Sequence, residues 1–447
     1  MDTLLDLHSQ LNALVWGPPM MVLLIGAGIV LTIATRAVQF RKLFFALREV
    51  LGKLFSPSQG EGTVTPFQAL ATALASTVGV GNIAGVSTAI FLGGPGALFW
   101  LLVSGLVGMA TKFAEIAIAL HYRERDDKGI VRGGAMYVLS KGLGLGSLGA
   151  IFALLTATAA FGIGNMVQAN SVASAAQASF GISPPVTGLV LMGLTALVVL
   201  GGIRRIAEVT QILVPLMCAL YILGTLVIVI RFIDQLPAAV ELVLSSAFNG
   251  AAAAGGFAGA TVASAMRYGV ARGMFSNEAG LGSAPMVHSS AVTDHPARQA
   301  CYGIFEVFVD TVVVCLLTGL VVLMTGAWQT GETGAPLAAK AFEIGLPGVW
   351  GHFVVSTGLI LFAFSTLIGW SYYGETGAAY LFGTGVSLPY RLLWIGFVYL
   401  GAIGGLHLVW DIADTLNGLM AIPNLIGVLG SIPIIVRLTR EFFAKQP

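Results

Sequence analysis

Residues 73–90 read ALASTVGVGNIAGVSTAI and carry no charge, although three glycines, an asparagine and several hydroxyls stand among them. Glycine inside a helix costs roughly 1 kcal/mol relative to alanine, and polar groups in hydrocarbon need partners. Close packing by small residues explains isolated glycines such as Gly105 or Gly319. It does not explain the asparagine beside glycines in GVGN at 79–82, so this tetrad predicts a helix that is interrupted within a membrane.

An interrupted helix has a specific chemistry, because one arm ends in free carbonyls and the next begins with free N–H groups at a positive dipole end. The N–H groups of Val80 and Gly81 suit a carboxylate, and the carbonyls suit an ammonium, so an α-amino acid matches both. Small hard cations such as sodium take oxygen ligands, as calcium does. Ser76, Thr77 and Asn82 supply such oxygens beside the break.

Polar side chains in two other apolar runs are candidate ligands. Ser365 and Thr366 are adjacent in LILFAFSTLIGWSYYGE, where each hydroxyl either donates to a carbonyl of its own helix or helps to clamp a cation. Asn165, Gln168 and Ser171 recur every three residues and share one helical face. Gln168 offers both a donor and an acceptor to a substrate carboxylate, whereas Asn165 is expected to bond between helices.

Two carboxylates fall inside an apolar run. Glu306 and Asp310 are four residues apart and therefore on one helical face. An intramembrane carboxylate is a functional hypothesis by default. The structural interpretation pairs these groups with Lys112, Arg267 or Arg272, and the alternative makes Asp310 a proton site.

The composition excludes several classes of function. Of 447 residues, 56% are hydrophobic and 10% charged, against roughly 25% charged in ordinary globular domains, so the chain is an integral membrane protein. A net charge of +1 gives no basic surplus for nucleic acid. The three cysteines lack metal-ligand spacing, and the six histidines form no HExxH motif. No GxSxG or Walker lysine context occurs, so neither an enzyme nor a nucleotide-binding protein is expected.

With about 20 apolar residues per crossing, the sequence predicts an all-α protein with eleven transmembrane helices. The first apolar run lacks the positive flank of a cleavable signal peptide and is expected to remain as an extra N-terminal span at 15–35. The ten spans that follow are expected at 66–93, 96–120, 148–179, 184–203, 206–232, 249–282, 297–326, 349–383, 389–409 and 411–437.

Charge sets the expected orientation. Between the first two spans, RAVQFRKLFFALREVLGKLF has one apolar and one basic face and predicts a helix in the cytoplasmic interface. Because successive spans cross the membrane in opposite directions, every lysine and arginine except Arg231 and Lys340 is then expected on the cytoplasmic side. The N-terminus would lie outside and the C-terminus inside. Arg267, Arg272 and Glu278 are expected at the cytoplasmic end of the span at 249–282, where they would form an inner gate.

Spans two to six and seven to eleven share one hydropathy pattern. Each copy opens with a glycine-interrupted span (STVGVGNIAG, GAAAAGGFAGATVASA) and closes with a span that has an interior proline, Pro215 or Pro423. Because five is odd, consecutive copies enter the membrane from opposite sides, which makes an inverted repeat with a transporter site at mid-membrane. The expected division is 1–36 extra span, 37–65 interfacial helix and linker, 66–232 first repeat, 233–437 second repeat and 438–447 cytoplasmic tail.

Several motifs resemble those of the alanine or glycine:cation symporter family over almost the whole chain. They are TALASTVGVGNIAGV, GGPGALFWLLVSGLVGMATKFAE, AFGIGNMVQANSV, GVARGMFSNEAGLGSAP and WDIADTLNGLMAIPNLIG. The second departs from the family pattern, because Leu101 and Leu102 stand where Met-Trp is common. The resemblance implies the leucine-transporter fold, a five-plus-five inverted repeat whose Gly-Leu-Gly-Asn break is similar to GVGN here.

The resemblance also implies ligand sets. A sodium ion would take the carbonyls of Ala75, Val78 and Phe362 and the hydroxyls of Ser365 and Thr366. Asn82 and Thr77 match positions near a second ion site. The implied substrate-binding residues are Thr77, Gly79, Val80, Gly81, Gln168, Gly256, Phe257, Gly259 and Thr261, of which the last four are expected to close over the substrate side chain.

These features predict a secondary active transporter in the cell (inner) membrane, in which sodium movement drives uptake of a small neutral amino acid of the alanine or glycine type by alternating access. A monomer suffices for this mechanism, and no nucleic acid partner is expected. A proton-coupled carrier of the same fold is the nearest alternative, but residues 73–90 contain no ionisable group. A passive channel lacks rings of charge, and a membrane-embedded enzyme lacks a catalytic set.

Overall fold

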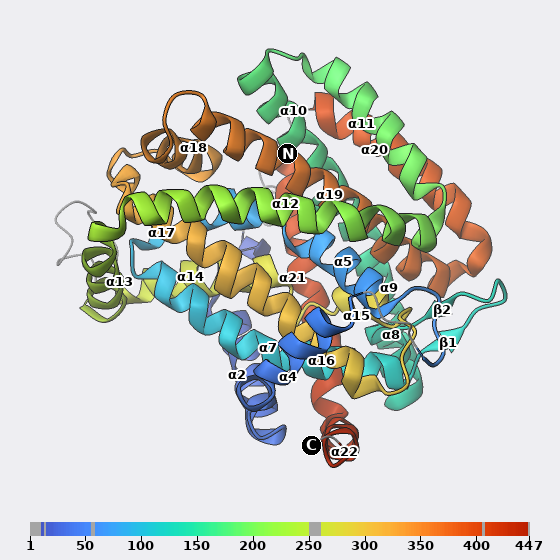
Figure 1. The fold of residues 1–447 in the computed structure, drawn as a ribbon. Helices are drawn as coiled ribbons and strands as arrows, with labels where there is room; N and C mark the ends of the chain where they lie inside the picture. The colour runs from blue at the N-terminus through green and yellow to red at the C-terminus, as the bar shows by residue number, and fades with distance from the viewer. Residues whose placement is uncertain (1–9, 13–14, 55–58, 250–260, 405–406, 446–447) are drawn as a thin grey trace.

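The computed structural model describes residues 10–445 apart from 13–14, 55–58, 250–260 and 405–406. In that part the chain is almost wholly helical, with one two-stranded hairpin (Figure 1). The elements up to residue 249 are α2 (Pro18–Ala34), α3 (Val38–Arg41), α4 (Leu43–Gly52), α5 (Pro66–Thr77), the π-helical turn η1 (Gly81–Gly85), α6 (Val86–Gly93), α7 (Ala97–His121), β1 (Glu124–Arg125), β2 (Val131–Arg132), α8 (Ala135–Tyr137), η2 (Val138–Gly142), α9 (Gly146–Ala160), η3 (Phe161–Met166), α10 (Val167–Phe180), α11 (Pro184–Val199), α12 (Gly202–Arg231), η4 (Ile233–Gln235) and α13 (Leu236–Asn249).

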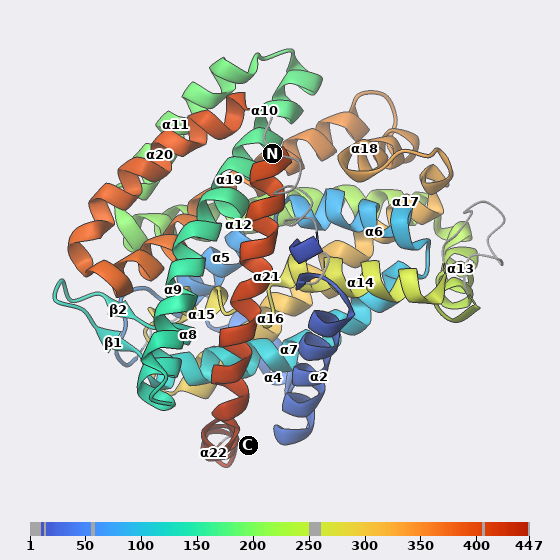
Figure 2. The ribbon, with the colours of Figure 1, turned by 180° about the vertical axis from the view of Figure 1, so that it is seen from behind.

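Helices of the second half lie among those of the first (Figures 1 and 2), and the two largest hydrophobic clusters contain residues of both halves. The elements of the second half are α14 (Val262–Asn277), α15 (Ala284–His288), α16 (Pro296–Val307), η6 (Phe308–Cys315), α17 (Leu316–Met324), η7 (Ala327–Gln329), α18 (Gly334–Gly345), α19 (Trp350–Phe382), η8 (Thr384–Val386), α20 (Ser387–Ile403), α21 (His407–Gly430) and α22 (Ile432–Phe443).

Each of the eleven predicted ranges contains a helix, but length and hydropathy alone support fewer crossings. Among the described residues, seven helices are long and apolar enough to cross a membrane, and the bent pair of α5 with η1–α6 makes an eighth. Helices α2 and α11 are apolar but shorter. The interior prolines expected in the closing spans lie within α12 and α21. The exact number of spans and the inverted repeat stay predictions.

Local sequence explains where the first broken span begins. The Thr65 hydroxyl accepts the N–H of Gln68 at 3.1 Å, and the Gln68 side chain accepts the N–H of Thr65 at 3.0 Å. This capping box, with Pro66 at the first helical position, satisfies N–H groups that a helix start leaves open. Helix α5 therefore starts at a fixed residue, which fixes the phase of the side chains that reach the break.

Small residues let helices approach closely around α7. A Cβ added at Gly273 of α14 would lie 2.0 Å from the Ser104 hydroxyl oxygen, so only glycine allows this contact. Added Cβ atoms at Gly105 and Gly319 would lie 2.6 Å from Thr311 and 2.5 Å from Leu98. The packing interpretation of these two isolated glycines is confirmed.

A helix does follow the first span, as α3 and α4. Val38, Ala46 and Val50 are buried in contact with neighbouring helices, whereas Phe44 is 82% exposed and Leu51 59%. The predicted apolar face is therefore divided between protein contacts and an outward surface. An outward apolar surface suits a helix lying on a bilayer, and that placement stays a prediction.

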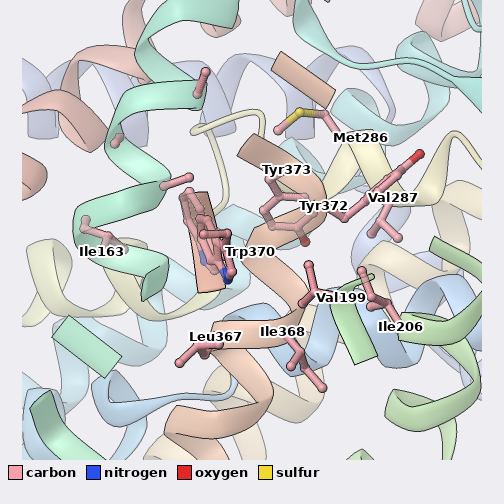
Figure 3. Close-up of a cluster of buried hydrophobic side chains, with 14 of the residues drawn as sticks. Ile163, Val199, Ile206, Met286, Val287, Leu367, Ile368, Trp370, Tyr372 and Tyr373 are labelled. Atoms are coloured by element: carbon pink, nitrogen blue, oxygen red, sulfur yellow. The ribbon is translucent and has the colours of Figure 1, made fainter. Parts of the chain in front are cut away.

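Three of the largest fully buried aromatic side chains lie on α19 (Figure 3). Trp370, Tyr372 and Tyr373 are at most 1% exposed and pack in one hydrophobic cluster with Ile163 of η3 and Val287 of α15. The cluster thus connects helices from both halves of the chain. It forms one side of the region where the candidate site lies.

A buried ion pair joins three further helices. Lys112 of α7 lies 3.2 Å from Glu306 of α16, and His288 of α15 bonds the other oxygen of that carboxylate at 3.0 Å. Gln299 in turn bonds His288 at 2.9 Å. All four side chains are fully buried. The structural interpretation of Glu306 is confirmed with Lys112 as its partner.

Removing one member of this pair should destabilise the fold. Lys112→Met leaves a buried carboxylate without its cation, which typically costs about 3–5 kcal/mol. We expect a melting temperature several degrees lower, measured by tryptophan fluorescence of purified protein. Lys340→Met breaks an exposed pair with Glu343 and is the control, since such pairs contribute about 0–1 kcal/mol. Equal melting temperatures for the two variants would contradict the assignment.

Candidate functional site

The first helix break lies at the predicted tetrad. Helix α5 ends at Thr77, and the arm that follows, Gly81–Gly93, is bent away from it by 51°. Between the two, Val78 is fully buried and extended, with φ −75° and ψ 92°. As the first residues of the second arm, Val80 and Gly81 have N–H groups without an acceptor in that arm.

The Asn82 side chain holds this break together. Its Oδ1 accepts the N–H of Gly79 at 2.8 Å, and its Nδ2 donates to Asp310 of η6 at 2.6 Å. The Asp310 carboxylate also accepts the hydroxyls of Ser276 at 3.0 Å and Thr311 at 2.9 Å. An ionisable group therefore does reach the break, although residues 73–90 contain none.

A second break follows α14, at a position that was not predicted from the sequence. Glu278, Gly280 and Gly282 have φ of 55°, 96° and 78°, and α15 begins at Ala284. The N–H groups of Gly280 and Gly282 donate to one oxygen of Glu115 on α7 at 3.0 and 3.2 Å. A fixed carboxylate thus satisfies the donors of this break.

The expected glycine-rich interruption at 250–260, with Gly256, Phe257 and Gly259, lies outside the described residues. Thr261 is described, and it caps α14: its hydroxyl accepts the N–H of Ser264 at 3.1 Å, and the residue is exposed. It does not line the cavity described below, and its role in substrate binding stays a prediction.

A small cavity joins the two breaks. It has a volume of about 20 Å³, enough for about one water molecule, so its walls must move to admit a ligand. Thirteen residues line it: Ser76, Thr77, Gly79, Val80, Gly81, Ile163, Gln168, Phe275, Ser276, Glu278, Thr366, Trp370 and Asn417. Five predicted substrate residues, Thr77, Gly79, Val80, Gly81 and Gln168, are therefore brought together.

Two acceptors in this lining lack partners among the described residues. Oε1 of Gln168 and Oδ1 of Asn417 are buried and form no hydrogen bond, while Nε2 of Gln168 donates to the carbonyl of Ile163 at 3.0 Å. An unsatisfied buried polar group costs about 1–3 kcal/mol. A ligand with N–H donors would remove that cost.

A carboxylate also reaches the cavity wall. Glu278 accepts the indole N–H of Trp370 on α19 at 2.9 Å and the hydroxyl of Ser283. Glu278 therefore lies between the second break and α19, not in a gate with Arg267 and Arg272. Those two arginines lie over the rings of Tyr268 and Phe275.

The predicted sodium ligands meet where α5 packs on α19. The Ser365 hydroxyl lies 3.2 Å from the carbonyl of Ala75 and 2.9 Å from that of Phe362. Thr366 donates to the same Phe362 carbonyl at 2.9 Å, so donation within the helix also describes these hydroxyls. Together with Val78 at the end of α5, the set consists of oxygens only, which suits a hard cation.

Asn165 forms a bond between helices, as expected. Its side chain donates to the carbonyl of Trp394 on α20 at 2.8 Å.

Sequence reasoning missed four residues that line the cavity: Phe275, Glu278, Trp370 and Asn417. A signal for one of them exists, because NEAGLG at 277–282 places a charge beside two glycines in an apolar run.

Comparison with related sequences decides which class of protein this is. The sequence profile of the sodium:alanine symporter family matches residues 1–447. The chain belongs to this family. The sodium/alanine symporter AgcS of Methanococcus maripaludis is 50% identical over 445 residues, covering 98% of this chain and 97% of AgcS. The symporter is thus a transporter and not an enzyme.

One more relative and one solved structure are similar to the symporter. YrbD of Bacillus subtilis, whose assigned name describes a sodium/proton-dependent alanine carrier, is 36% identical over 442 residues, with 95% of this chain and 89% of YrbD covered. The structure of MhsT in complex with L-phenylalanine has a TM-score of 0.51 at 16% identity, covering 85% of this chain and 98% of MhsT. This likeness places the symporter in the leucine-transporter fold.

Glycine at 79 should matter for the α5–α19 contact. A Cβ there would lie 2.7 Å from the Thr366 hydroxyl oxygen, whereas at Gly81 the nearest atom, on Phe275, would be 3.6 Å away. We expect Gly79→Ala to weaken the apparent affinity for the coupled cation by about tenfold, equivalent to 1.4 kcal/mol. Gly81→Ala should change the cation affinity less. Cation titration of amino acid uptake measures both, and the reverse order would contradict the packing described.

Proposed function

We propose that this protein couples sodium entry to uptake of a small neutral amino acid, alanine or glycine, across the cell membrane. The observation that carries the proposal is one cavity lined both by the start of the second arm of a broken helix, at Val80 and Gly81, and by two amide side chains whose oxygens have no described partner. A zwitterion offers the matching carboxylate and ammonium. A cavity of about 20 Å³ favours the smallest amino acids, because each added methylene requires further displacement of the wall.

The substrate would lie with its carboxylate at the N–H groups of Val80 and Gly81. Its ammonium would donate to Oε1 of Gln168 and Oδ1 of Asn417, which no described group satisfies. This reverses the first expectation for Gln168, whose Nε2 is already used by Ile163. Gly256, Phe257 and Gly259 remain proposed as a cover for the substrate side chain.

Sodium would bind the carbonyls of Ala75, Val78 and Phe362 with the hydroxyls of Ser365 and Thr366. Both hydroxyls would then turn their lone pairs toward the ion instead of donating to Phe362. Asn82 is proposed for a second cation near Asp310, whose negative charge would offset the charge of the ion. Two sites would couple more than one charge to each substrate.

Sodium at the α5–α19 contact would favour the arrangement open to the outside and order the substrate site. The repeats 66–232 and 233–437 would then rock about this site and expose it inward, with the N-terminus outside and the C-terminus cytoplasmic. Each charge that moves inward gains about 2.3 kcal/mol per 100 mV, which drives accumulation. One chain contains every group that this cycle requires, so a monomer suffices.

The sodium ligands can be tested in liposomes. We expect alanine to accumulate above equilibrium under a sodium gradient and not when choline replaces sodium. Ser365→Ala and Thr366→Ala should each raise the sodium concentration for half-maximal uptake by about tenfold or more, since a hydrogen-bonding or ligating oxygen at a charged group contributes about 1.5–3 kcal/mol.

Ser371→Ala is the matched control, because Ser371 lies on the same helix and donates to the carbonyl of Ile368. It should leave the sodium dependence unchanged. Unaltered sodium dependence in both Ser365→Ala and Thr366→Ala would end the assignment of this sodium site.

Proton coupling is a second candidate, supported by the Glu278 carboxylate in the cavity wall and by the name of YrbD. Under sodium coupling, Glu278→Gln should retain sodium-driven uptake, reduced by no more than about tenfold, since this carboxylate then carries no transported charge. A proton carrier that uses Glu278 would instead accumulate alanine in a pH gradient without sodium, and Glu278→Gln would abolish that uptake. Measuring uptake under each gradient alone separates the two.

A further inference from the structure

A second cavity shares no lining residue with the substrate cavity. Its lining comes from the β1–β2 hairpin, the α11–α12 turn and the start of α20, which lie near one another in Figures 1 and 2. Its volume is about 310 Å³. Four basic side chains line it, Lys128, Arg132, Arg204 and Arg391, and none of its lining residues is acidic. Nothing in the transport cycle above uses this cavity.

Two of these cations are fixed in place by carboxylates behind them. Glu375 accepts Arg391 at 2.7 and 2.9 Å and Arg132 at 3.3 Å, and Asp126 accepts Arg132 at 2.8 Å. Burial by itself would lower the pKa of Arg132, but Tyr372, Glu375 and Asp126 raise it, so the guanidinium stays charged. These two guanidinium groups are therefore held rigidly, and the two carboxylates behind them offset their charge.

The other two cations are not neutralised. Lys128 donates to the carbonyl of Thr384 at 2.9 Å, and neither Lys128 nor Arg204 forms an ion pair in the described part of the chain. The charges of Lys128 and Arg204 are therefore not matched by a salt bridge to any described carboxylate. They are available to an anion.

Two buried polar atoms of the lining also lack a hydrogen-bond partner among the described residues. Nη1 of Arg132 and Oγ of Ser387 form no hydrogen bond with any described group. The Arg132 side chain is 3% exposed and Ser387 is 5% exposed, so water outside the protein does not readily satisfy them. An oxygen-rich anion could accept from both.

One long helix begins at the same cavity. Helix α12 starts at Gly202, which lines the cavity, and it has no side-chain cap. It therefore directs the positive end of its dipole toward the cavity, which favours phosphate-like anions.

The surface beside the cavity is apolar. Leu388 lines the cavity and is 56% exposed, and Leu392 further along α20 is also 56% exposed. On the neighbouring α11, Leu197 is 72% exposed and Leu200 43%. An anion that carries hydrocarbon chains fits both surfaces, whereas a free anion uses only the first.

We propose that this cavity binds the phosphodiester headgroup of an anionic phospholipid, with its acyl chains along α11 and α20. The lipid phosphate would bond Arg132 and Ser387 and pair with Lys128 and Arg204. Basic pockets between helices at the cytoplasmic side bind anionic headgroups in this manner. The lipid would join the hairpin, the α11–α12 turn and α20, so that anionic lipid stabilises the protein.

The test uses the full-length protein in nanodiscs of phosphatidylcholine with and without one-fifth phosphatidylglycerol. We expect phosphatidylglycerol to raise the melting temperature of the wild type and to remain bound in native mass spectra after detergent extraction. Lys128→Gln/Arg204→Gln should lower the bound fraction at least fivefold and abolish the thermal shift. These side chains hold no structural ion pair, so the fold should persist in phosphatidylcholine alone.

Arg205→Gln is the matched control, because Arg205 is adjacent, exposed and paired with Glu208 without lining the cavity. It should bind lipid as the wild type does. Equal phosphatidylglycerol binding by the double variant and the wild type would overturn the proposal. Stabilisation by sodium phosphate without lipid, lost in the double variant, would overturn the lipid assignment and leave a free-phosphate site.

Discussion

Main-chain polar groups released by two helix breaks inside the apolar core must find partners, and the interior of the symporter is arranged around that requirement. At the second break, Glu115 accepts the N–H groups of Gly280 and Gly282. At the first, Asn82 serves Gly79 and is itself held by Asp310. The start of the second arm, at Val80, lines the cavity and has no side-chain partner of this kind among the described residues, so it is available to a ligand.

The buried charges of the symporter follow from the same constraint. Asp310 and Glu115 each accept several donors that the breaks or their neighbours release, and Glu306 is matched by Lys112 and His288. An unpaired charge at this depth would cost more than the break itself. The sequence suggested Asp310 as a candidate proton site. In the structure these carboxylates are explained first as partners of main-chain, hydroxyl and ammonium groups, and any role in transport is additional to that.

Hydropathy made the positions of the helices predictable, since each predicted range contains a helix. The first break was also predictable, because glycines and an asparagine in an uncharged run have a polar cost that packing does not offset. The break at 278–283 was not predicted, since the richer glycine cluster at 250–260, which lies outside the described residues, drew attention from NEAGLG. The partners Glu115 and Asp310 were beyond sequence reasoning because they lie far along the chain, and only tertiary packing brings them to the breaks.

The most direct test of the central claim is a structure of the protein determined with sodium and L-alanine. The account predicts the alanine carboxylate within about 3 Å of the N–H groups of Val80 and Gly81, a normal hydrogen-bond distance, with its ammonium beside Gln168 and Asn417. Alanine bound elsewhere, with an unbroken α-helix through residues 79–82, would contradict it.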